Sequence, residues 1–148
     1  MALNCVSVAK AMKKEEEAGG KPEAAVENDG KKESREWFGR AFELYGKALE
    51  QMRKVPNGEL EQAVTYLNMT DALEGRDGPE AAEKEINACL DTAYELLKTP
   101  SVPRDGYYAF VCEKCAPAFS YHGYFLAAEE LKNLSAEIYK ARQEDSRG

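Results

Sequence analysis

Hydrophobic residues recur at intervals of three and four along most of the chain, which is the spacing of an amphipathic α-helix. Ile86, Leu90, Ala93 and Leu97 are the clearest example. No segment alternates apolar and polar residues over a useful length, so we expect no β-sheet. The pattern predicts about six helices, over residues 1–10, 37–52, 59–74, 79–97, 106–119 and 124–142.

Turn-forming residues separate these helices and leave short connections. A Pro-Asn-Gly sequence at 56–58 separates the second and third helices, and two prolines within 99–103 stop the fourth. Short connections favour antiparallel neighbours. The sequence therefore predicts one all-α domain over residues 1–148, built from three antiparallel helical hairpins.

Two segments have a different composition. Residues 13–36 contain almost no large apolar side chain and include several glycines. We expect most of this segment to be a solvated, flexible connector whose ends extend the neighbouring helices. Residues 143–148 are polar, and we expect a frayed tail there.

The helix pair over 63–96 has a recurring order of small and large apolar residues within about 34 residues. Thr70 stands at a small position of the first helix, and Ala82, Ile86 and Cys89 form a small, large, small row in the second. The same row recurs earlier in the chain at Ala41, Tyr45, Ala48 and Leu49. These residues resemble the tetratricopeptide repeat (TPR) family. The resemblance implies a short α-solenoid of stacked helical hairpins.

The resemblance also implies a protein-interaction module that binds a peptide or protein partner. In this family the first helix of each pair lines a groove. Carried over residue by residue, the resemblance implies partner-binding positions at Asn4, Ser7, Lys10, Asn68, Asp71, Glu113, Lys114 and Tyr121. An open N-terminal repeat would allow a homodimer, because an uncovered apolar face associates.

The segment 105–141 looks like the C-terminal end of longer bacterial TPR proteins. A regulatory domain detached from a larger protein of this class is therefore an alternative function.

The net charge of the chain limits the classes of partner that it can bind. The chain has 148 residues, a formal net charge of -7 and a pI near 4.9. Such a surface repels phosphate, which argues against nucleic acid and anionic membrane. No apolar run approaches the roughly 20 residues needed to span a bilayer. The N-terminus lacks the features of a signal peptide, so we expect a cytoplasmic protein with reduced thiols.

Cys112, Cys115 and His122 form the one constellation that suggests chemistry. With Cys89 they could supply zinc ligands, and a CxxC pair is also a redox motif. The pair lies inside a predicted helix with no strand before it, so we favour two small packing residues one turn apart. No nucleophile or phosphate-binding motif accompanies the single histidine. We therefore predict no enzyme activity and no cofactor.

The last predicted hairpin is rich in aromatic residues, namely Tyr107, Tyr108, Phe110, Phe119, Tyr121, Tyr124 and Phe125. So small a hairpin cannot bury all seven, and we expect a few to reach the surface. Exposed tyrosine is a common anchor for protein partners. A purely structural cap is the alternative.

Overall fold

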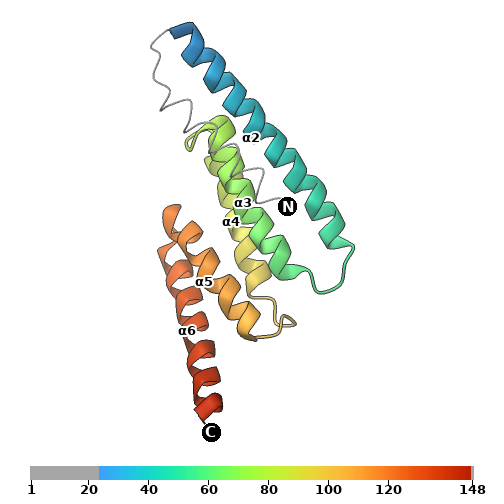
Figure 1. Cartoon of the computed structure of the whole chain (residues 1–148), viewed down its shortest axis with the longest axis vertical. Helices are drawn as coiled ribbons and strands as arrows, with labels where there is room; N and C mark the ends of the chain where they lie inside the picture. Colours follow the sequence, from blue (N-terminus) through green and yellow to red (C-terminus); the bar gives the residue numbers. More distant parts are fainter. Residues whose placement is uncertain (1–23, 148) are drawn as a thin grey trace.

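The computed structural model describes residues 24–147, which form five α-helices (Figure 1). They are α2 (Ala24–Arg53), α3 (Glu59–Asp77), α4 (Glu83–Leu97), α5 (Gly106–Tyr121) and α6 (Phe125–Arg147). Every regular element of this described part is a helix, which confirms the all-α class. The helix predicted over residues 1–10 lies outside the described residues.

Helix α3 lies at the centre of the fold and contacts α2, α4 and α5 (Figure 1). The turn before it contains Asn57, whose φ of 65° is in the left-handed region that asparagine tolerates. Phe38 and Tyr45 of α2 are buried against Met69 and Ala72 of α3. The spacing of three and four residues along α2 therefore produces one buried stripe that faces α3.

A second and larger core joins α3, α4, α5 and α6. Leu90 and Leu97 of α4, Phe119 of α5 and Leu131 of α6 are fully buried in it. The Tyr108 hydroxyl donates a hydrogen bond of 2.9 Å to the carbonyl oxygen of Leu97. This bond satisfies a carbonyl at the end of α4 that has no partner within its own helix.

The hairpin of α5 and α6 has clear boundaries. The Asp105 carboxylate accepts a hydrogen bond of 2.9 Å from the backbone N–H of Tyr108 and caps α5. Gly123 has a φ of 84°, which favours glycine and allows the tight turn into α6. α5 continues two residues beyond the predicted end, with Pro117 inside it.

Several helix ends differ from the predicted ones. α2 begins at Ala24, so all of residues 24–36 are helical, whereas the sequence predicts that most of residues 13–36 form a flexible connector with only its ends helical. Gly30 is the one glycine in this stretch, and an interior glycine costs a helix only about 1 kcal/mol. Ala, Glu and Lys residues around it are good helix formers. α4 begins at Glu83, because Gly78 adopts a φ of 86° and residues 79–82 form a turn. α6 continues to Arg147 through residues expected to fray.

Candidate interaction surface

Two tyrosines of α5 bind carboxylates of α3. The Tyr107 hydroxyl donates to Glu61 at 3.2 Å, and the Tyr121 hydroxyl donates to Glu74 at 2.8 Å. Burial and the nearby Glu61 carboxylate raise the pKa of Tyr107. The hydrogen bond to Glu74 raises the pKa of Tyr121, and the negative charge of Asp71 adds to the effect. These pairs connect α3 and α5 near both ends of α5.

From Tyr107 to Tyr121, α5 exposes a mostly apolar stripe of side chains that we call the α5 seam. It consists of Tyr107, Phe110, Lys114, Pro117 and Tyr121, which follow one another at spacings of three and four residues. The exposed fractions are 51% for Tyr107, 49% for Phe110 and 69% for Tyr121. The prediction that some aromatics of this hairpin reach the surface is confirmed. Four of the five residues in the seam are aromatic or apolar.

The rest of α5 is buried, and it is also apolar. Its inward residues are Tyr108, Ala109, Val111, Cys112, Cys115, Ala116 and Phe119. Only Glu113 and Lys114 are charged among its 16 residues. α5 is therefore apolar around almost its whole circumference, which is the composition of a helix buried on all sides.

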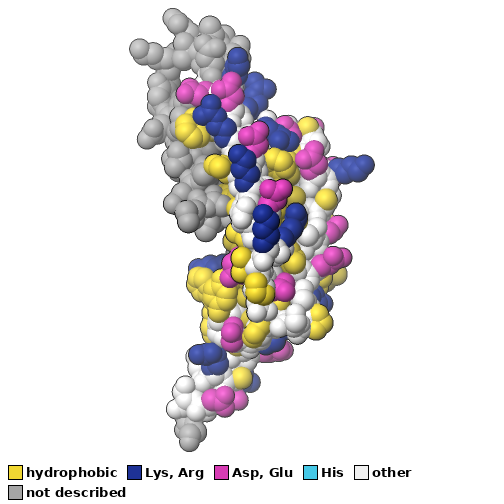
Figure 2. All heavy atoms as spheres, turned by 90° about the vertical axis from the view of Figure 1, so that its right-hand side faces the viewer, with side chains coloured by type: hydrophobic (Ala, Val, Ile, Leu, Met, Phe, Trp, Pro, Cys, Tyr) yellow, Lys and Arg dark blue, Asp and Glu magenta, His cyan; other side chains and the backbone are white. Residues whose placement is uncertain are grey.

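The outward face of α2 is different. It carries alternating charges at Lys32, Glu36, Arg40, Glu43, Lys47 and Glu50, all exposed. Figure 2 views the molecule from the α2 side and shows basic and acidic side chains interspersed on this surface. A mixed charged face of this kind is typical of a helix side that contacts only water.

The partner-binding positions predicted from the resemblance fall into three groups. Lys114 and Tyr121 lie in the α5 seam, and Asp71 of α3 is close enough to Tyr121 to raise its pKa. Asn68 is half-buried one turn before Asp71 on α3. Glu113 lies apart from them, because it accepts a 3.5 Å hydrogen bond from Tyr139 of α6. The predicted positions Asn4, Ser7 and Lys10 lie outside the described residues.

Some residues of this surface are absent from the predicted set. Phe110 and Pro117 belong to the α5 seam, and their spacing from Lys114 is a signal already present in the sequence. Glu61 and Glu74 belong to this surface because they accept hydrogen bonds from Tyr107 and Tyr121, which lie 46 and 47 residues further along the chain. No local pattern could have assigned that role to these two carboxylates.

The cysteine and histidine candidates do not form a metal-binding group in the described part of the chain. Cys112 and Cys115 are buried in the core, and burial raises the pKa of both thiols, that of Cys115 to about 12. Cys89 is half-buried, and burial raises its pKa to about 11. His122 caps the C-terminus of α5 and lies edge-on against Tyr121. No group of three His, Cys, Asp or Glu residues suited to a metal occurs within 24–147.

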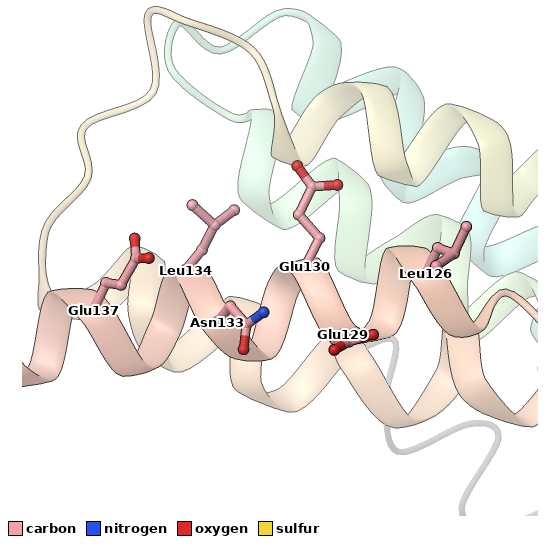
Figure 3. A pocket seen from close by; sticks show the side chains of 6 residues that line it. All are labelled: Leu126, Glu129, Glu130, Asn133, Leu134 and Glu137. Atoms are coloured by element: carbon pink, nitrogen blue, oxygen red, sulfur yellow. The ribbon is translucent and has the colours of Figure 1, made fainter.

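A shallow, open depression lies along α6 (Figure 3). Its lining residues are Leu126, Glu129, Glu130, Asn133, Leu134 and Glu137. The Glu130 carboxylate accepts a hydrogen bond from Tyr94 and pairs with Lys98 at 2.7 Å. Glu130 therefore connects α6 to the end of α4. This acidic surface has no aromatic residue, in contrast to the α5 seam.

The comparisons with known proteins give no match. No family model, no curated protein and no solved structure matches the chain. Among the described residues, no helix combines the length and apolar character required to cross a membrane.

Proposed function

We propose that the protein is an interaction module that binds a peptide or protein through the surface formed by α3 and the α5 seam. The observation that carries this proposal is the exposure of Tyr107, Phe110 and Tyr121 on a helix that is apolar on its other sides. Exposed aromatic anchors beside polar groups are typical of protein interfaces. Phe110 and Tyr121 supply apolar contact area, and the α3 carboxylates supply directional polar contacts.

The arrangement of the helices supports a stack of hairpins of the TPR type as part of the same proposal. α3 pairs with α4, α5 pairs with α6, and α3 also contacts α5. The first helices of two successive hairpins therefore lie beside each other. In a stack of this kind, adjacent first helices form one continuous surface for a partner.

An unbiased selection tests this function. A random peptide library is displayed and selected against the wild-type protein, and the dissociation constants of enriched peptides are measured by fluorescence anisotropy. The same peptides are then titrated into Phe110→Asp and Leu126→Asp variants. Leu126 is 84% exposed on α6, so this control adds the same charge at another exposed apolar residue.

We expect Phe110→Asp to weaken binding at least about tenfold, as replacing an aromatic anchor does, and Leu126→Asp to leave binding unchanged. Circular dichroism of both variants should match wild type, because Leu126 is 84% exposed and Phe110 is 49% exposed and outside the buried core. Equal binding by the two variants, or no enriched peptide, would contradict the proposed function.

A further inference from the structure

The composition of α5 indicates which kind of partner the α5 seam accepts, and this inference rests on the proposed function. A helix that is apolar on all sides is ordinarily covered on all sides. The remaining helices cover the inward residues of α5, but the seam is exposed. Its spacing of three and four residues is the spacing by which one helix packs along another.

The charges around the seam have a definite pattern. Lys114 is the central residue, and its Nζ lies 5.5 Å from the centre of the Phe110 ring. On the α3 side, the seam is bordered by carboxylates, with Glu61 near one end and Glu74 near the other. Asp71 adds negative charge near the Glu74 end. A partner therefore meets one positive charge in the middle and a negative margin along one side.

We propose that the α5 seam binds an amphipathic helix of another protein. The apolar stripe of this helix packs on Phe110, Pro117 and the two tyrosines, and an acidic residue in its middle faces Lys114. Basic residues lie on the flank that faces the α3 carboxylates. Because α5 has 16 residues and is therefore about 24 Å long, the partner helix has about four turns.

A second copy of the chain fits this surface poorly. Lys114 is the middle residue of the seam, so two copies that pair through their seams in register, in either direction, place the two lysines against each other. The footprint of a helix about 24 Å long and about 10 Å wide is roughly 240 Å². A stable dimer ordinarily buries about 800 Å² on each partner. A short helix with complementary charge suits the dimensions and the charge of the seam better.

Three designed peptides test the inference. The first is a four-turn amphipathic helix with a central glutamate and lysines on one flank. The second has the same composition with the glutamate on the flank and a lysine in the centre. The third repeats the first with a proline in the middle, which prevents a continuous helix. Each is titrated into wild type, Phe110→Asp, Leu126→Asp and Lys114→Glu by fluorescence anisotropy.

We expect the first peptide to bind wild type at least about fivefold more tightly than either of the others. The second peptide loses the favourable charge contacts, and the third loses the continuous helix. Lys114→Glu should reverse the order of the first two peptides, because the central charge pair is then exchanged. Phe110→Asp should weaken the first peptide about tenfold, and Leu126→Asp should not.

Three results would overturn the inference. If the proline-containing peptide binds as tightly as the first, the partner segment is not a helix. If the order of the first two peptides is the same on wild type and Lys114→Glu, the charge pattern does not select the partner. The proposed function is tested separately by the library peptides. It still holds after either of these two results if those peptides bind Phe110→Asp more weakly than wild type. Failure of all three peptides to bind wild type also overturns the inference.

Discussion

Gly75 of α3 packs directly against the ring of Phe38 of α2, and replacing it with alanine should destabilise the fold. A Cβ atom added at Gly75 would lie 2.5 Å from the Cγ and Cδ atoms of Phe38, whose side chain is only 2% exposed. Overpacking of this kind costs about 1–3 kcal/mol. Alanine itself favours a helix over glycine by about 1 kcal/mol. The net change should therefore be a loss of stability of up to about 2 kcal/mol.

Gly46→Ala is the matched control. Gly46 lies inside α2, and a Cβ atom added there meets no atom within 4 Å. This variant should gain about 1 kcal/mol from helix propensity alone. Since the propensity gain is common to both variants, the difference between their free energies of unfolding isolates the clash and should be about 1–3 kcal/mol.

Urea unfolding of wild type and both variants provides the measurement. The single tryptophan, Trp37, precedes Phe38 in α2 and packs at the edge of the same core, so its fluorescence reports unfolding. A Gly75→Ala variant that is stabilised as much as Gly46→Ala would refute the close approach of α2 and α3.

Three further predictions concern the core and its polar contacts. Tyr108→Phe should lower the free energy of unfolding by about 1–3 kcal/mol, because it leaves a buried carbonyl unpaired, and urea titration that shows no loss would exclude this role. Cys112 and Cys115 should stay unmodified by iodoacetamide at neutral pH in mass spectra until urea is added, because burial raises the pKa of both thiols. The hydrogen bond from Lys98 lowers the pKa of Glu130, so wild type should be more stable than Glu130→Gln at neutral pH. This advantage should disappear as the pH falls below the usual carboxyl pKa of 4.5, and urea midpoints that keep the same difference in acid would contradict it.

The sequence was sufficient to predict the helical class, because the apolar spacing is strong over most of the chain. The residues at which the helices begin and end were harder to predict. The helical start of α2 has no apolar stripe of its own, and its glycine and acidic residues resemble a connector. The late start of α4 depends on the positive φ of Gly78, which the Gly-Pro sequence permits but does not require. Local signals therefore located the helices and left their ends undetermined.

The candidate surface was only partly predictable for a geometric reason. Glu113 and Lys114 are neighbours in sequence, but successive residues of a helix are turned by about 100°. Lys114 consequently lies in the α5 seam, while Glu113 contacts Tyr139 of α6. Helix spacing alone could have separated these two residues. The contribution of Glu61 and Glu74 depends on which face of α3 lies beside α5, and that information exists only in the folded chain.

NMR can map where a partner peptide binds on the protein. Two-dimensional amide spectra of the labelled protein are recorded while the first designed helical peptide, or a peptide from the library selection, is added. If the α5 seam is the binding surface, the perturbed amides cluster along the seam and on the adjoining part of α3 between Glu61 and Glu74. Perturbations confined to the α6 surface between Leu126 and Glu137, or to the outward face of α2, would contradict it.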